Sequence, residues 1–267
     1  MFIEKFLQHF GLSAMPFARS VPEVGLFEHK SFTEAFTRVS FAVESRTPAL
    51  LTAEPGLGKS TLLGTFADRL DKSRSRIVYT ALCACGPYGL IGQLAVRYGV
   101  KQRHSAAQTA QLVLDALARS DKNEILILDD GHHLPRQTLD ELRLLSNLDF
   151  DRTPPFALLL VGQPALREHL IEPELSSLWQ RLAIRASLSP LSEKETADYL
   201  DRRLRAVGAM TTVFKPDAVE KLFERCRGIP RLINNLATAA LFGAATAGKK
   251  HVDLKEIADA AFDQENS

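Results

Sequence analysis

The sequence predicts an α/β fold: a parallel five-stranded sheet flanked by helices, followed by a small all-helical C-terminal domain. Three observations predict this fold: five short β-rich runs, helical patterns between them, and helical patterns alone after Leu188. Strands that alternate with helices are typical of layered α/β domains. We therefore expect a core domain over residues 1–188 and a helical lid domain over residues 189–267.

The β-rich runs indicate a sheet that is covered on both faces. Two of them, "EILILD" and "FALLLVG", are nearly continuous apolar runs. Strands of this kind are buried on both sides, as in a parallel sheet with helices on each face. The five runs span residues 48–53, 76–82, 124–129, 156–162 and 183–188.

Helices are predicted where apolar residues recur at spacings of three and four. In the core domain this pattern covers residues 60–70, 105–120 and 136–147. In the helical domain, Ser192 and Glu195 have the spacing of a capping box that begins a helix. Further helical patterns start from Pro216, Pro230 and Asp253, and proline suits the first turn of a helix.

The composition is that of a soluble globular protein. The chain has 267 residues, of which 45% are apolar and 24% charged, with a formal net charge of +1. Without a global basic field, contact with nucleic acid requires a local patch. We expect no signal peptide and no membrane partner, because no apolar stretch is long enough. Three cysteines without a framework spacing are typical of reduced thiols, so we expect a cytoplasmic protein.

The stretch "LLTAEPGLGKSTLL" has the pattern of a phosphate loop. Gly56 and Gly58 let the backbone curl so that its N–H groups converge on an anion. Lys59 would reach the β and γ phosphates of ATP, and Ser60 would offer its hydroxyl to Mg²⁺. Ala53 stands where glycine is usual, and its methyl is tolerated if the turn needs no positive φ. The residues that we expect to contact the nucleotide are Ala53, Glu54, Pro55, Gly56, Leu57, Gly58, Lys59, Ser60 and Thr61.

The stretch "ILILDDGHHL" places two acids and two histidines after the third β-rich run. A phosphate loop requires an acid at the end of a second strand to hold the water shell of Mg²⁺, and Asp129 has that position. Asp130 has the next position, where we expect the residue that polarises the attacking water, although glutamate is more usual. His132 and His133 are expected as surface or packing residues, with zinc ligation as the alternative.

Several motifs, in this order, resemble those of the AAA+ ATPases: the phosphate loop, "ILILDD", "LLLVGQP", "LWQRL" and "GIPRLIN". Within that family the sequence is similar to the ATPase domain of general secretion pathway protein A and to transposition-helper ATPases, such as the target-selecting ATPase of phage Mu. "HFGLSAMPF", "ELRLLSNLDFD" and "LLLVGQPALREHL" are the most specific matches. The resemblance covers residues 10 to about 260.

The resemblance implies roles for three further residues. Gln163 would be a polar sensor of the γ-phosphate or the water, with a plain turn residue as the alternative. Arg181 would be the arginine finger that completes a neighbouring subunit's site, or else a solvated arginine. Arg231 would be the second sensor, which couples domain angle to nucleotide state, or else part of a structural ion pair. The side chains of Phe10, Leu12 and Phe17 would lie near the adenine or in the core.

Two functions follow from the resemblance. The first is an oligomeric ATPase, a ring or helical filament, that binds double-stranded DNA without sequence preference and recruits or stimulates a transposase. The second is an ATPase module of secretion or envelope assembly. The secretion form continues into a transmembrane segment and a cell-wall-binding domain that this sequence lacks, so we favour transposition. The cationic candidates for DNA contact are Lys72, Arg74, Arg76, Arg97, Lys101 and Arg103.

Overall fold

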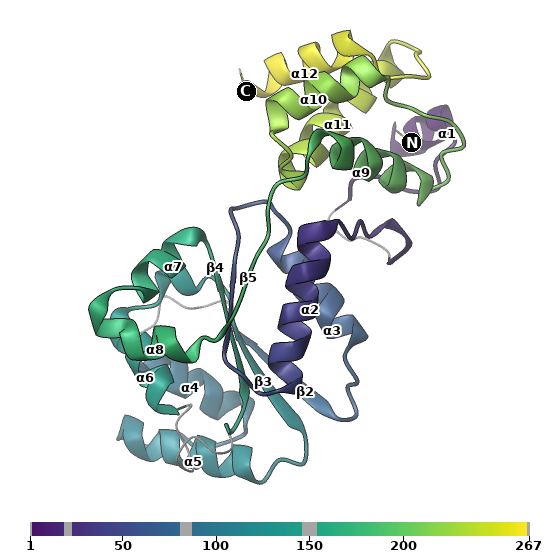
Figure 1. Cartoon of the computed structure of the whole chain (residues 1–267). Helices are drawn as coiled ribbons and strands as arrows, with labels where there is room; N and C mark the ends of the chain where they lie inside the picture. Colours follow the sequence, from purple (N-terminus) through teal and green to yellow (C-terminus); the bar gives the residue numbers. More distant parts are fainter. Residues whose placement is uncertain (1, 19–22, 81–86, 146–153, 266–267) are drawn as a thin grey trace. The chain divides into compact units, whose positions relative to one another are not determined.

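The computed structural model describes residues 2–18, 23–80, 87–145 and 154–265. The chain forms two compact units (Figure 1). The sheet unit comprises Ser31–Pro55 and Lys59–Leu188, and the helical unit comprises Met1–Lys30, Gly56–Gly58 and Ser189–Ser267. The change of unit after Leu188 lies where the core domain was expected to end. Residues 1–30, in contrast, group with the helical unit and not with the core domain.

The sheet unit contains the expected parallel sheet. Its strands lie in the order β2-β3-β4-β1-β5, and each neighbouring pair is parallel. Every strand is one of the predicted runs, with ends that differ by at most two residues, so the predicted fold class is confirmed. The strands are β1 (Ala49–Thr52), β2 (Ser75–Thr80), β3 (Asn123–Leu128), β4 (Ala157–Gly162) and β5 (Ile184–Ser187).

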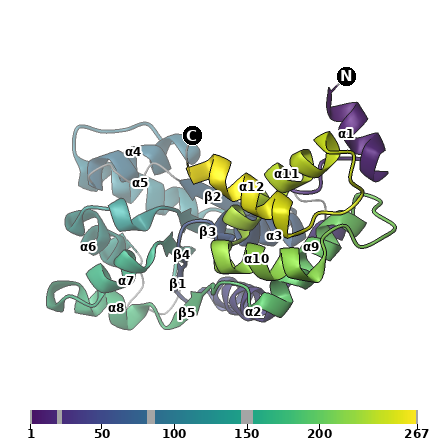
Figure 2. The same cartoon turned by 90° about the horizontal axis from the view of Figure 1, so that it is seen from above.

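Helices cover both faces of this sheet (Figures 1 and 2). Helices α2 and α3 lie on one face and α4 to α8 on the other. Right-handed crossovers produce this division, because the chain moves outward from β1 to β2 and then returns in steps toward β5. The helices of this unit are α2 (Lys30–Glu44), α3 (Lys59–Arg69), α4 (Pro87–Arg97), α5 (Ala106–Ala118), η2 (Gly131–His133), α6 (Arg136–Leu145), α7 (Pro164–Leu170), η4 (Pro173–Leu175) and α8 (Ser176–Arg181).

Strand β3 illustrates how the sheet is buried. Leu126 and Leu128 belong to an apolar cluster shared with helices α4 to α8. Because successive side chains point to opposite faces, Ile125 and Ile127 point toward the layer of α2 and α3. All four are at most 1% exposed. Burying an aliphatic side chain of this size contributes roughly 1.5–3 kcal/mol, so the strand is anchored from both faces.

The helical unit has its own apolar core. Leu12 and Phe17 are buried in it, and Phe10 packs against it, so the structure places all three in a core. The Phe6 ring contacts that of Phe242 on α11, with 4.6 Å between their centroids, which fixes α1 to this unit. Its helices are α1 (Phe2–Phe10), η1 (Glu23–Gly25), α9 (Glu193–Arg205), α10 (Pro216–Cys226), α11 (Pro230–Thr246) and α12 (Leu254–Glu265).

The helix starts predicted in this unit are confirmed. Ser192 and Glu195 form the capping box at the start of α9, with both reciprocal bonds present. Pro216 and Pro230 are the first residues of α10 and α11. Such local signals are reliable because cap and helix are adjacent in the chain.

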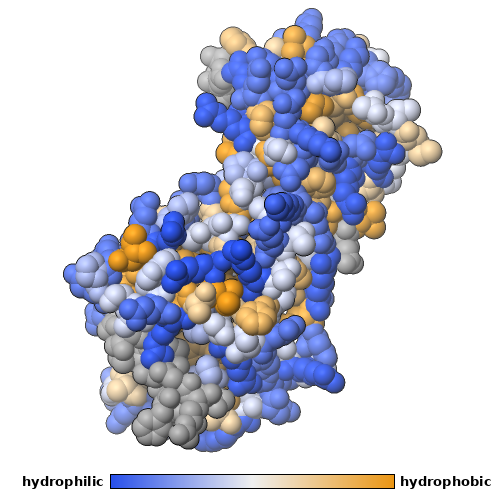
Figure 3. All heavy atoms as spheres, in the orientation of Figure 1, coloured by the Kyte–Doolittle hydropathy of each residue, from blue (hydrophilic) through white to orange (hydrophobic). Residues whose placement is uncertain are grey.

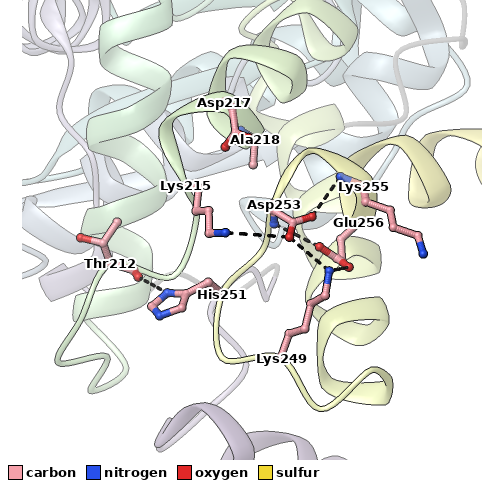
Figure 4. A network of polar contacts seen from close by, with 9 residues as sticks. All are labelled: Thr212, Lys215, Asp217, Ala218, Lys249, His251, Asp253, Lys255 and Glu256. Carbon is pink, nitrogen blue, oxygen red and sulfur yellow. Dashed lines mark hydrogen bonds and ion pairs between the residues drawn. The ribbon is translucent and has the colours of Figure 1, made fainter.

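A polar network begins α12 (Figure 4). Asp253 accepts from the Lys255 N–H at 3.1 Å, and the buried Glu256 accepts from the Asp253 N–H at 3.1 Å. The Lys249 ammonium contacts both acids, at 3.1 Å and 2.6 Å, and Lys215 lies 3.9 Å from Asp253. The network therefore ties the end of α11 and the start of α10 to the cap of α12.

The face in Figure 3 is largely hydrophilic, with apolar side chains interspersed, as the charged fraction of 24% leads one to expect. Within the described parts of the chain, no helix has both the length and the apolar character needed to cross a membrane.

Candidate nucleotide-binding site

The phosphate loop follows β1 at the carboxyl edge of the sheet. The Ala53 N–H donates to the Gly162 carbonyl at 3.1 Å, so the loop starts pinned to the end of β4. Ala53 is not among the residues with positive φ, so its methyl causes no backbone strain. Gly56 and Gly58 do have positive φ, +90° and +100°, which other L-residues rarely adopt.

Helix α3 begins directly after the loop. Its first residue, Lys59, turns its ammonium back onto the loop, 2.5 Å from the Ala53 carbonyl and 3.3 Å from that of Glu54. Ser60 is the next residue and is exposed. The sequence thus places an ammonium, a hydroxyl and a helix N-terminus together, a combination that binds phosphate.

Asp129 is buried at the end of β3 and is held at three points. Its N–H donates to the Thr80 carbonyl at 2.9 Å, which extends the β2–β3 ladder by one residue. One carboxylate oxygen, Oδ1, accepts from the Asp130 N–H at 2.9 Å. The other, Oδ2, accepts from the Tyr79 hydroxyl at 2.7 Å. The orientation of this carboxylate is therefore set by residues on both sides of it.

Asp130 has a left-handed backbone conformation, with φ +53° and ψ +33°, and its side chain is exposed. Aspartate and asparagine adopt this region more readily than most residues. This conformation is a physical reason for aspartate at position 130, where glutamate is more usual.

The two histidines lie in the short helix η2. Their rings are 4.0 Å apart, and Nδ1 of His132 is buried with no hydrogen-bond partner among the described residues. Burial lowers the pKa of His132, and the neighbouring His133 lowers it further. In the described parts of the chain, no three His, Cys, Asp or Glu side chains gather as metal ligands. Cys83 and Cys85 lie outside the described residues.

Gln163 follows β4, which lies between the strands that carry the phosphate loop and Asp129. Strand register brings these segments to one edge, because Thr52 pairs with Gly162 and Leu128 pairs with Leu160. Gln163 is the N-cap of α7, has an extended backbone and is partly exposed. The topology therefore brings together the phosphate loop, Asp129 and Gln163.

The structure does not bring Arg181 to this edge. Arg181 ends α8, three residues before β5, and thus lies near the amino end of that parallel strand. A second arginine, Arg185, is on β5 itself, with its guanidinium 3.5 Å from the Trp179 ring centroid and bonded to the Leu182 carbonyl at 2.9 Å. Position at the opposite end of the strands agrees with a role outside this chain's own site.

Arg231 is the second residue of α11 in the helical unit and is exposed. Within that unit, which includes residues 56–58, its N–H donates to the Gly56 carbonyl at 3.3 Å. A Cβ placed on Gly56 would come within 2.9 Å of the Arg231 Cβ. Glycine at position 56 is therefore required by close approach as well as by positive φ.

The donor set fits a nucleoside triphosphate with Mg²⁺. Oxygen ligands such as the Ser60 hydroxyl and the Asp129 carboxylate suit a hard divalent cation, and Lys59 suits phosphate oxygens. A Cβ placed on Gly58 would meet no atom within 4 Å, so the loop is open at that point. Bound Mg²⁺ would neutralise charge on the phosphates.

The cationic candidates for DNA contact differ in their surroundings. Arg97 and Lys101 are exposed. Arg76 is instead joined to the buried Glu124 at 2.9 Å and lies over the Tyr98 ring. Arg74 lies 3.6 Å from Asp71. The segment 72–76 is thus partly neutralised within the chain, and 97–101 is the more open cluster.

These features define the P-loop NTPase fold in its AAA+ form. Residues 43–170 match the family described as an AAA domain. General secretion pathway protein A of Aeromonas hydrophila is 29% identical to the chain over 264 residues, which are 97% of this chain and 48% of that protein. The chain therefore spans about half the length of that relative. These matches support the resemblance to AAA+ ATPases, and the transposition-helper branch stays a prediction.

Solved structures agree on the fold. Cdc6p from Pyrobaculum aerophilum superposes with a TM-score of 0.74 at 20% identity, over 93% of this chain and 70% of that chain. ORC1 from Aeropyrum pernix, solved in complex with DNA, gives a TM-score of 0.66 at 17% identity, over 91% of this chain and 68% of that chain. At such identities the likeness establishes the fold and not the activity.

Sequence reasoning missed Tyr79. The sequence shows that Tyr79 lies near the end of a β-rich run. It does not show the order of the strands in the sheet, which places β2 beside β3. Thr80 was missed for the same reason.

Proposed function

We propose that the chain is a Mg²⁺-dependent ATPase that hydrolyses ATP to ADP and phosphate. The observation that carries this proposal is the meeting of the phosphate loop and Asp129 at one edge of the sheet. Lys59 would bind the β and γ phosphates, and Ser60 and Asp129 would hold Mg²⁺ with its water shell. Asp130 would polarise the attacking water, and Gln163 would sense the γ-phosphate.

The active form in this proposal is an assembly of copies of the chain. Arg181 lies at the opposite end of the strands from the phosphate loop, which suits an arginine finger acting on a neighbouring subunit. Arg231 would act as the second sensor from the helical unit. Fingers of this kind contribute roughly 10³ to 10⁵ in rate, because they stabilise charge that develops in the transition state.

A mixing experiment tests both parts. Lys59→Ala should lose tight ATP binding, and Arg181→Ala should bind ATP but hydrolyse it poorly. Mixing the two variants should partly restore phosphate release, since a mixed interface unites an intact loop with an intact finger. If the variants co-assemble and no activity returns, Arg181 does not act in trans. Near-native ATP affinity of Lys59→Ala in calorimetry would reject the phosphate-loop assignment.

As the biological role of this ATPase, we propose that the ATP-bound assembly binds double-stranded DNA and regulates a transposase. The resemblance of the motifs and the exposed cations Arg97 and Lys101 support this proposal. Binding through the phosphate backbone should show little sequence preference and fall steeply with salt.

Filter binding at rising salt tests the DNA proposal. The double variant Arg97→Ala, Lys101→Ala should reduce the salt slope by about two, one for each lost phosphate contact. Arg205→Ala is the matched control, because Arg205 is exposed in the helical unit and paired with Asp201. Absence of ATP-dependent retention at every salt concentration would reject DNA binding.

A second function has a specific observation in its favour. The similarity to general secretion pathway protein A extends over 97% of this chain. We therefore retain an ATPase module of secretion or envelope assembly as the alternative. Filter retention of duplex DNA measured with and without ATP separates the two, because only the first predicts ATP-dependent DNA binding.

A further inference from the structure

Tyr79 contacts Asp129 from the neighbouring strand. It is the fifth residue of β2 and lies opposite Ile127 in the parallel register. Side chains two residues apart on a strand share a face, so Ile127 and Asp129 both face the layer of α2 and α3, as Tyr79 does. The phenol reaches past Ile127 and donates to Oδ2 of Asp129 at 2.7 Å. Tyr79 is 43% exposed, whereas Asp129 is 6% exposed.

The two oxygens of Asp129 are thereby held by different donors. The Asp130 N–H holds Oδ1 at 2.9 Å. The phenol holds Oδ2. Two fixed donors on opposite oxygens restrict rotation of the carboxylate about its side-chain bonds.

We propose that Tyr79 is a positioning residue that orients Asp129 toward Mg²⁺. Groups that hydrogen-bond to a metal-binding carboxylate fix its geometry, and removing one typically lowers metal affinity or activity by 10- to 100-fold. The inference rests on the proposed ATPase function, since Asp129 has a metal to hold only if the site takes Mg²⁺ with the nucleotide.

A purely structural role for the Tyr79 bond is the competing explanation, and the chain contains a matched control. Tyr98 also donates its hydroxyl to a buried acid of β3, the Oε2 of Glu124, at 2.9 Å. Glu124 lies at the amino end of the strand, away from the phosphate loop. Tyr79→Phe and Tyr98→Phe each remove one phenol–carboxylate bond from β3, but only the first removes it at the candidate site.

The experiment measures binding of a non-hydrolysable ATP analogue by calorimetry, first in EDTA and then across a Mg²⁺ titration. In EDTA, all three proteins should bind alike. With Mg²⁺, Tyr79→Phe should need about tenfold more metal than the parent for half of the metal-dependent gain in affinity. Tyr98→Phe should keep the parent's requirement for Mg²⁺.

The outcomes separate the inference from the proposed function. If Tyr79→Phe has the parent's Mg²⁺ requirement, or a lower one, Tyr79 does not position Asp129 for the metal. If Tyr98→Phe shifts the requirement equally, the effect is general to the strand and the inference is again wrong. If the parent gains no affinity from Mg²⁺, the proposed function itself is wrong, and the inference falls with it.

Discussion

The two ends of β3 hold buried acids in contrasting ways. At the amino end, Glu124 is joined to the Arg76 guanidinium at 2.9 Å by two contacts and accepts from Ser120 and Tyr98. At the carboxyl end, Asp129 accepts from the Tyr79 phenol and from the Asp130 backbone amide. The Glu124 side chain faces the layer of α4 and α5, and Asp129 faces the layer of α3, which follows the phosphate loop.

This difference separates an acid that serves stability from one suited to catalysis. A buried carboxylate matched with a cation is neutralised, and breaking the pair leaves an uncompensated charge. A carboxylate beside the phosphate loop lies where the proposed Mg²⁺ would bind. Both acids are at most 6% exposed, so burial alone does not distinguish them. Their positions at opposite ends of β3 do.

The largest expected effect is that of Asp129→Asn on turnover. The substitution keeps shape and removes the charge that would hold Mg²⁺. Metal ions contribute several kcal/mol of transition-state stabilisation, so phosphate release should fall by at least about a hundredfold. Unfolding in urea, followed by Trp179 in the sheet unit, should change little. Turnover within tenfold of the parent would show that Asp129 does not hold a catalytic Mg²⁺.

Asp130→Asn sharpens the contrast at the carboxyl end. Asparagine tolerates the left-handed conformation, so the Asp130 N–H should still orient Asp129. Loss of the carboxylate should lower turnover by about a hundredfold, which is the lower limit of the rate enhancement that a general base contributes. Mg²⁺-dependent binding of the ATP analogue should persist. Phosphate release and calorimetry on one preparation measure both quantities. Unchanged turnover would show that Asp130 does not polarise the water.

Asp130→Glu is the companion variant. Glutamate extends the reach of the carboxylate but is less suited to φ +53°. For a residue other than Gly, Asn or Asp, the left-handed conformation lowers the stability of the fold by about 1 kcal/mol. We therefore expect Asp130→Glu to be less stable than Asp130→Asn in urea. Equal stability of the two would contradict the backbone explanation for aspartate at this position.

Glu124→Gln should affect stability and not the candidate site. It weakens the contacts to Arg76 and Tyr98. Breaking a fully buried pair costs about 3–5 kcal/mol. Because Arg76 is 41% exposed and can reach water, we expect about 2 kcal/mol here. Affinity for the ATP analogue with Mg²⁺ should equal the parent's. A shift in that affinity larger than threefold would show that the two ends of β3 are coupled.

The fold was largely predictable because its signals are local or periodic. Apolar runs gave the strands, and caps such as Ser192 with Glu195 gave the helix starts. The phosphate loop and Asp129 were recognisable because their spacing and strand-end positions are specific. Tyr79 could not be predicted, because its contact depends on β2 lying beside β3. For Leu12 and Phe17 the sequence left the core and the adenine as equal alternatives, since a contact between distant segments leaves no local pattern.

The smallest expected effect concerns a partly exposed network in the helical unit, where Asp253 caps α12. Hydrogen bonding with Glu256 and with the Lys249 ammonium lowers the pKa of Asp253 to about 2, below its ordinary 3.8. A carboxyl whose pKa is lower in the folded state stabilises the fold above its ordinary pKa. That contribution is lost as the pH falls from about 4 through about 2. Asp253→Asn should therefore lower the free energy of unfolding at pH 7. The difference between the variant and the parent should become smaller as the pH falls from about 4 to about 2. Urea unfolding by circular dichroism at several pH values measures it, with Asp217→Asn, in the first turn of α10, as the control. A margin that stays constant down to pH 2 would show that the charge on Asp253 contributes nothing, and that its role is geometric.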